Sequence, residues 1–302
     1  MTSTEARSVA PVSAPSAEPS PVRSTPRWFR VLVGVLAVVV VATFWPAMNG
    51  HAHQPSVADF FPDAIFGAGT FFSFTRMTLA RVLVAVVVCL VLGIGASRLR
   101  LIPTRGQQLL EVLAEFVRKS ICVDMLGEAV GRRYAPLIGL ILIGVFGMNV
   151  TGIIPGIDIA ASSVMAVPLV FAVLAYAAMI YSGIRAHGVG EFLVSQLFPP
   201  GVPKALYLLI TPIEFLSTFV VRPATLAIRL LANMISGHFL LAMTYFGTSA
   251  LLAAAGAMKG LALLTGAAAI VVTLFELFIA ALQAYIFAVL TTVYIKLSVE
   301  SH

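Results

Sequence analysis

Residues 222–238 read Arg-Pro-Ala-Thr-Leu-Ala-Ile-Arg-Leu-Leu-Ala-Asn-Met-Ile-Ser-Gly-His and lie inside a long apolar segment. Between Pro223 and Lys259 the only strongly ionised side chain is that of Arg229. A charged side chain at the centre of a membrane costs about 2.5–3.5 kcal/mol on insertion scales. A helix that only had to span would not carry this charge, so we expect Arg229 to have a function.

The composition of the whole chain indicates an all-α integral membrane protein. Of its 302 residues, 60% are hydrophobic and 11% are charged, and the mean hydropathy is +1.01. Soluble domains carry about 25% charged residues. The apolar runs are long and continuous, which excludes a barrel of short alternating strands. The net charge of +6 comes from basic residues clustered in short loops, which fits a membrane protein better than a nucleic-acid-binding one.

The N-terminal part of the chain divides into three segments. Residues 1–27 are rich in Ser, Pro and Ala and are expected to be disordered. Residues 28–48 hold a short apolar run between Trp28 and Trp45. This run is either an extra hydrophobic helix or a signal sequence, and retention is favoured because Trp45-Pro46 makes a poor cleavage context. Residues 49–71 are expected to form an external loop.

Residues 72–302 predict a membrane domain with five hydrophobic elements and, before the second of them, an amphipathic helix over 106–130 on the cytoplasmic side. The fourth run is too long for one straight span and contains Pro212 and Pro223, so a bent or tilted element is expected. The stretch 186–204 is expected to be a loop. The five elements are Phe72–Ser97, Ala135–Ile157, Ile159–Ile184, Ala205–Ser249 and Gly260–Tyr294.

The distribution of basic residues predicts the topology. They gather at 98–105, 118–133, 185, 204 and 296, whereas 49–69 and 155–161 contain none. By the positive-inside rule, the first set is cytoplasmic. The C-terminus is therefore expected on the cytoplasmic side.

Polar residues recur at helical spacing after Arg229. Asn233, Ser236 and Gly237 follow it on one predicted helix face, and small residues there would let another helix approach closely. The alternative is an arginine that extends its charge to the membrane interface. The apolar residues on both sides favour a functional charge over that alternative.

The last two hydrophobic elements are expected to form an antiparallel hairpin of long tilted helices. Gly256 lies midway in sequence between Arg229 and Gln283, and Ala257 lies midway between His238 and Glu276. In a hairpin that turns there, the members of each pair lie at equal depth, and the second pair lies about 13 Å closer to the turn.

His238 and Glu276 could therefore exchange protons within the membrane, since both can change charge near neutral pH. The alternative is a structural hydrogen bond. His238 is roughly half a helical turn around from Arg229 and need not face the same neighbour.

Several motifs resemble those of the a subunit of F-type ATP synthases. The strongest are Arg-Leu-Leu-Ala-Asn-Met-Ile-Ser-Gly over 229–237 and Leu-Gln-Ala-Tyr-Ile-Phe over 282–287. Segments 111–117, 135–140, 148–155 and 213–217 fall in the order expected of that family. Ala160 stands where many members have an asparagine.

The resemblance implies roles for individual residues. Arg229 would be the essential proton-translocation arginine, with Asn233 and Gln283 as polar neighbours. His238 and Glu276 would be the family's outer Glu–His pair with the two residue types exchanged. Glu214 and Ser217 would belong to the cytoplasmic half-channel.

The resemblance also implies a stator subunit that couples proton flow to ATP synthesis in the plasma membrane of a bacterium. Its partners would be a ring of rotor hairpins, peripheral-stalk subunits, membrane lipid and, indirectly, a soluble catalytic head, with no nucleic acid. A secondary transporter or ion channel for a small solute is the alternative, although no internal repeat supports a transporter. No phosphate loop, metal-ligand cluster or nucleophile–base pair is evident, so we expect no cofactor, no metal and no catalysis by the chain alone.

Overall fold

The computed structural model describes residues 64–66, 74–97, 105–153, 162, 164–198, 206–254 and 258–300. The predictions for 1–27 and 28–48 lie outside these residues. Within the predicted external loop, only 64–66 are described. They form strand β1 (Ala64–Phe66), which pairs antiparallel with β2 (Phe74–Thr75).

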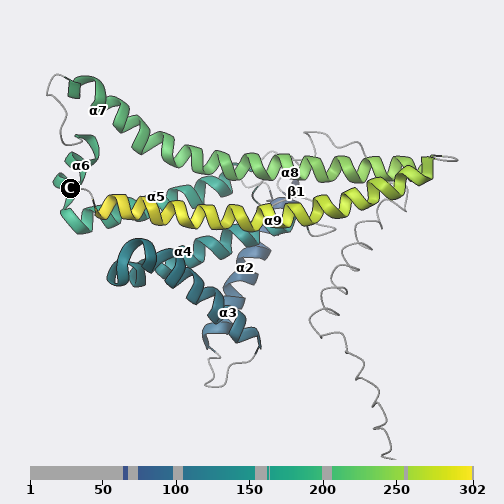
Figure 1. The fold of residues 1–302 in the computed structure, drawn as a ribbon, viewed down its shortest axis with the longest axis horizontal. Coiled ribbons are helices and arrows are strands. Elements are labelled where there is room, and N and C mark those ends of the chain that lie inside the picture. Colours follow the sequence, from purple (N-terminus) through teal and green to yellow (C-terminus); the bar gives the residue numbers. More distant parts are fainter. Residues whose placement is uncertain are drawn as a thin grey trace, which may run out of the picture. The chain divides into compact units, whose positions relative to one another are not determined.

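Five helical stretches in the described part are long and apolar enough to cross a membrane (Figure 1), which confirms the all-α membrane fold. The first is α2 (Arg76–Ser97), which starts directly after β2. It is apolar all round, and large side chains such as Val87, Leu90 and Val91 are exposed. An apolar surface of this kind is stable against lipid but not against water.

The predicted amphipathic helix is present and continues into the second span. It comprises α3 (Arg105–Phe116), the π-helical segment η2 (Val117–Val123) and the start of α4 (Asp124–Val150), which ends in the 3-10 turn η3 (Thr151–Ile153). Val117 and Ile121 are buried, whereas Glu115 and Lys119 are exposed and form an ion pair. Gly127 has a φ of 77°, a conformation that favours glycine, and it kinks the helix before the apolar part of α4.

The third span is α5 (Ala166–His187). The next segment corrects a prediction, because residues 189–197 of the expected loop form helix α6 (Val189–Leu197). Gly188, with a φ of 84°, separates the two helices. The ring of Phe192 is buried against Gly183, where a Cβ atom would lie 2.4 Å from the ring. Together with a hydrogen bond from Thr211 of the next helix to the carbonyl of Leu197 at 3.4 Å, this contact holds a helix that is too short to stand out in the sequence.

The fourth stretch comprises α7 (Tyr207–Leu216), the π-helical segment η5 (Ser217–Val221) and α8 (Arg222–Ala253). The π-helical segment lies between the two prolines, where the sequence predicts a bend. The last helix, α9 (Met258–Val299), has 42 residues and is therefore about 63 Å long. The hydrocarbon core of a bilayer is only about 30 Å thick, so α9 must tilt or extend beyond it.

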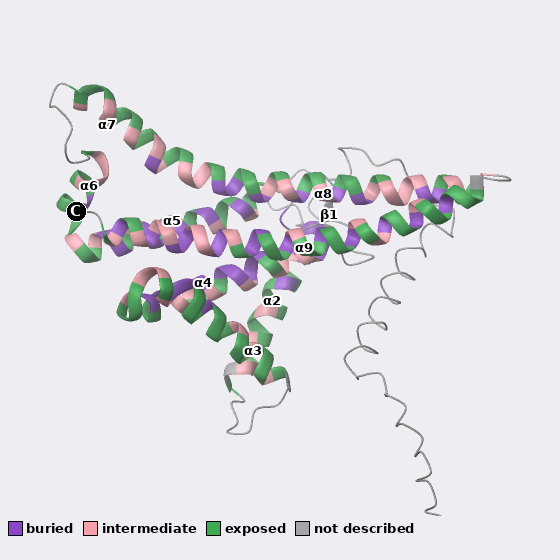
Figure 2. Ribbon diagram, in the orientation of Figure 1, coloured by how far each residue is buried: buried purple, intermediate pink, exposed green. Residues whose placement is uncertain are grey.

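The core lies where α4, α5, α8 and α9 pack together, as the burial colours in Figure 2 show. Large side chains such as Ile141, Leu230 and Phe287 fill it. Small residues such as Ala175 and Ala288 are fully buried between them and permit close helix packing. The long helices α8 and α9 are thus held in fixed register, which positions the polar residues between them.

Candidate functional site

Arg229 lies on the exposed side of α8. Its helical neighbours on that side, Ile228 and Ile235, are also exposed, so the charge stands in an apolar surface. Among the described residues, no carboxylate forms an ion pair with Arg229. Arg229 is therefore an exposed charge that lies one helical turn from Asn233, at the edge of the polar groups that α8 and α9 share.

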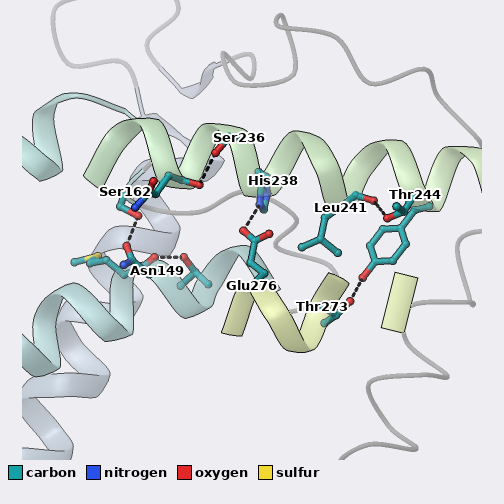
Figure 3. A network of polar contacts seen from close by, with 12 residues as sticks. Asn149, Ser162, Ser236, His238, Leu241, Thr244, Thr273 and Glu276 are labelled. Carbon is teal, nitrogen blue, oxygen red and sulfur yellow. Dashed lines mark hydrogen bonds and ion pairs between the residues drawn. The ribbon is translucent and has the colours of Figure 1, made fainter. Parts of the chain in front are cut away.

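A histidine and a glutamate meet on the opposite side of α8. The Nδ1 atom of His238 lies 4.0 Å from Oε1 of Glu276 on α9 (Figure 3). Only 8% of His238 and 5% of Glu276 are exposed. The structure thus brings together the two residues that the hairpin argument placed at equal depth.

Gly237 makes the space that Glu276 occupies. A Cβ atom on Gly237 would lie 2.7 Å from both carboxylate oxygens. A larger residue at 237 would therefore displace the carboxylate. The sequence indicated close helix packing at Gly237 but did not identify Glu276 as its neighbour. Ser236, predicted with it, instead lies exposed and donates to the carbonyl of Asn233.

Asn233 and Gln283 form a second link between the helices. The Nδ2 atom of Asn233 donates to Oε1 of Gln283 at 2.9 Å. This contact joins Gln283 to the residue one helical turn after Arg229, and the equal depth of Gln283 and Arg229 stays a prediction. Gln283 is 2% exposed, and its Nε2 atom has no partner among the described residues.

Further polar residues lie towards the turn of the hairpin and beside it. The hydroxyls of Tyr245 and Thr273 are 3.0 Å apart between α8 and α9. Ser162 donates to Oδ1 of Asn149 at 2.7 Å, and both residues are buried. Figure 3 shows both contacts in the same view as His238 and Glu276. The sequence singled out none of these contacts.

Glu214 and Ser217 lie apart from this cluster, near the junction of α7 and α8. Glu214 accepts a hydrogen bond from Thr218 at 3.4 Å, and Nη2 of Arg222 lies 3.9 Å from the same carboxylate oxygen. Ser217 is the first residue of η5. Thr218 and Arg222 are the neighbours of Glu214 that the sequence did not reveal. Among the described residues, no group of three or more His, Cys, Asp or Glu side chains could hold a metal ion.

The chain matches the family model described as ATP synthase A chain over residues 78–296, which include every site residue named above. It belongs to this family. The match confirms the resemblance found in the sequence and the assignment to the membrane sector of an F-type ATP synthase.

Curated relatives share most of their length with the chain. The ATP synthase subunit a of Rhodococcus erythropolis is 38% identical over 250 residues, which cover 82% of this chain and 91% of the relative. That of Frankia alni is 41% identical over 221 residues, with 73% and 75% covered. That of Magnetococcus marinus is 38% identical over 211 residues, with 69% and 76% covered.

Membership of the ATP synthase A chain family decides between the functional classes that the sequence left open. The chain is a multi-pass membrane subunit of the ATP synthase and has the stator role in proton translocation. It works as part of a complex that contains rotor and stator partners. The polar residues of α8 fall into two kinds. Asn233 and His238 contact residues of α9, whereas Arg229 is exposed.

Proposed function

We propose that this subunit forms two proton half-channels and presents Arg229 to a ring of rotor hairpins. The observation that carries the proposal is the division of polar groups on α8. Asn233 and His238 meet partners on α9, whereas Arg229 is exposed and forms no ion pair with a described carboxylate. An exposed charge in an apolar membrane surface is costly, so we expect a partner outside the chain to carry the opposite charge.

The surface beside Arg229 suits a moving helix. Ala232 and Ser236 follow it at helical spacing and are exposed. Small side chains let a second helix come close. We therefore place the rotor ring against this side of α8, with each hairpin carrying one carboxyl group buried in the membrane.

Arg229 would act through its fixed charge. A positive charge favours the ionised form of a carboxyl group that approaches it. Each rotor carboxyl would release its proton on reaching Arg229 and take up another after passing it. The same charge would stop protons from crossing directly between the half-channels.

The buried row supports an outer half-channel that runs past His238, Glu276, Asn233 and Gln283. Groups that can bind and release a proton are needed along such a path. The junction of α7 and η5, with Glu214 and Ser217, supports the inner half-channel. The hydrogen bond from Thr218 and the nearby guanidinium of Arg222 would hold the Glu214 carboxylate in place.

In the assembled enzyme, the chain would lie in the plasma membrane of a bacterium with its C-terminus in the cytoplasm. Peripheral-stalk subunits would hold it still against the soluble catalytic head. One charge moved across 100 mV releases about 2.3 kcal/mol, so several protons per turn of the ring can drive ATP synthesis.

The test replaces Arg229 with alanine. Membrane vesicles carrying Arg229→Ala should lose both ATP-driven proton pumping and proton-driven ATP synthesis, because the rotor carboxyl loses its counter-charge. The matched control is Arg133→Ala, which removes an exposed arginine of α4 outside both half-channels. If the Arg229→Ala complex assembles and retains both activities, the proposal is wrong.

A further inference from the structure

A pocket lies away from the α8–α9 site, among α2, α3, η2 and α4. Its volume is about 630 Å³. Most of its wall is apolar and comes from all four segments, with Leu92, Leu110, Val117, Ala135, Leu140 and Ile143 among the lining residues. The pocket therefore offers an apolar ligand a site within the membrane domain.

Charged residues also line the pocket, and most of them are already engaged. Gln107 donates to Oε1 of Glu111 at 2.7 Å, and Arg132 forms an ion pair with Glu128. Arg118 forms no ion pair with a described carboxylate, whereas its neighbour Lys119 pairs with Glu115. The charge of Arg118 acts on Glu115, but its guanidinium forms no ion pair with a described carboxylate and can contact an anion at the edge of the apolar wall.

The lining carboxylate is separated from this cation. Glu111 precedes Arg118 by seven residues, or about 10 Å along a helix. Arg132 also lines the pocket, and although it is paired with Glu128, which does not line it, its remaining guanidinium N–H groups add donors beside Arg118. A ligand with one negative group and a long apolar part would match both the charge and the wall.

We infer that this pocket binds an acidic phospholipid, with its phosphate at Arg118 and Arg132 and an acyl chain along α4 towards Ile143. Basic pockets between membrane helices on the cytoplasmic side recognise anionic lipid headgroups. Both arginines belong to the basic cluster 118–133, which the positive-inside rule places on that side.

The size of the pocket favours a lipid over a helix of a partner subunit. One turn of an α-helix with its side chains occupies on the order of 500 Å³. The pocket would therefore hold little more than one turn, whereas a spanning helix has five or more. A flexible acyl chain can instead follow the irregular wall.

The test uses photoactivatable lipids and the purified ATP synthase in lipid nanodiscs. A photoactivatable phosphatidylglycerol should label residues 106–143, and the matching phosphatidylcholine should label them about fivefold less. A basic residue near an anionic lipid contributes about 1 kcal/mol, which corresponds to about fivefold in occupancy. Arg118→Gln should reduce the phosphatidylglycerol label by a similar factor. The control Arg133→Gln changes an exposed arginine that does not line the pocket, and should leave the label intact.

A second variant fills the pocket without changing its charge. A Cβ atom on Gly139 would meet only Cγ1 of Val117, at 3.9 Å, so Gly139→Phe can extend into the cavity. It should abolish the label, whereas Gly93→Phe should not, because Gly93 has open space around it and does not line the pocket.

Two results would overturn the inference. One is equal labelling by both lipids together with no effect of Arg118→Gln. The other is efficient cross-linking of an Ala114→Cys variant to a partner subunit, which would mean that a protein segment occupies the pocket.

Discussion

The two sides of α8 differ in how their polar groups are satisfied. On the side that packs against α9, Asn233 donates to Gln283, and His238 lies 4.0 Å from Glu276. On the exposed side, Arg229 stands among apolar and small residues and forms no ion pair with a described carboxylate. The polar groups of the inward side thus meet neighbours on α9, whereas Arg229 meets no described carboxylate.

This difference indicates what each side of α8 is suited to do. Buried polar groups are stable when they are paired, and the inward row finds partners on α9 within this chain. An unpaired guanidinium in an apolar membrane surface is costly unless a partner supplies the opposite charge. The inward side of α8 therefore suits a fixed path, and the outward side suits a site that is completed in the assembly.

The largest effect on the inward side is expected at Gly237. Gly237→Val would place a branched side chain where the Glu276 carboxylate lies, since even a Cβ atom would come within 2.7 Å of it. Overpacking costs about 1–3 kcal/mol. We expect a loss of on the order of tenfold or more in ATP-driven proton pumping, measured in membrane vesicles.

The control for this change is Gly247→Val on the same helix, where a Cβ atom meets nothing within 4 Å. It should pump at nearly the normal rate. Equal losses in the two variants would show that the contact between Gly237 and Glu276 has no special importance.

An intermediate effect is expected from the His238–Glu276 pair. Residues in contact have interaction energies of about 0.5–3 kcal/mol. Glu276→His or His238→Glu alone would leave two like groups facing each other and should reduce pumping about tenfold. The double exchange restores one imidazole and one carboxylate and should recover most of the activity. Single variants that pump normally would make the pair dispensable for proton transfer.

The smallest effect is expected from the Asn233–Gln283 hydrogen bond. Removing either partner leaves a buried amide unsatisfied and costs about 1–3 kcal/mol. In a double-mutant cycle of pumping rates, Asn233→Ala and Gln283→Ala should therefore be clearly non-additive, with a coupling of about 1 kcal/mol.

The comparison cycle combines Gln283→Ala with Thr248→Ala. The Thr248 hydroxyl donates to the carbonyl of Thr244 in its own helix, so these two changes should be additive. Additivity in both cycles would contradict a functional link between Asn233 and Gln283.

Sequence patterns predicted the long elements well. Continuous apolar runs predicted the five spans, because the thickness of the bilayer fixes the length of a spanning helix. The helical period of apolar residues predicted the amphipathic helix. Helix α6 was missed because its nine residues are held mainly by the burial of Phe192 against Gly183, a tertiary contact with no local signal.

Within the site, the hairpin argument correctly placed Glu276 beside His238, and the equal depth of Gln283 and Arg229 stays a prediction. The sequence predicted elements that end at Ser249 and begin again at Gly260, whereas the helices extend to Ala253 and start again at Met258. Apolar small residues gave no signal for where α8 ends. The contact of Gly237 with Glu276 and the hydrogen bond between Ser162 and Asn149 depend on how the helices rotate against each other, which spacing alone does not determine.

The most direct test of the account asks whether the exposed side of α8 faces the rotor. In a cysteine-free complex, with Cys89→Ser and Cys122→Ala in this chain, Ser236→Cys would be paired with a cysteine next to the carboxyl group of the rotor hairpin. Val91→Cys on α2, which is also exposed, would serve as the control. The account predicts that oxidation cross-links only the Ser236→Cys complex, stops ATP-driven proton pumping, and is reversed by a reductant. Cross-linking through Val91→Cys and not through Ser236→Cys would contradict it.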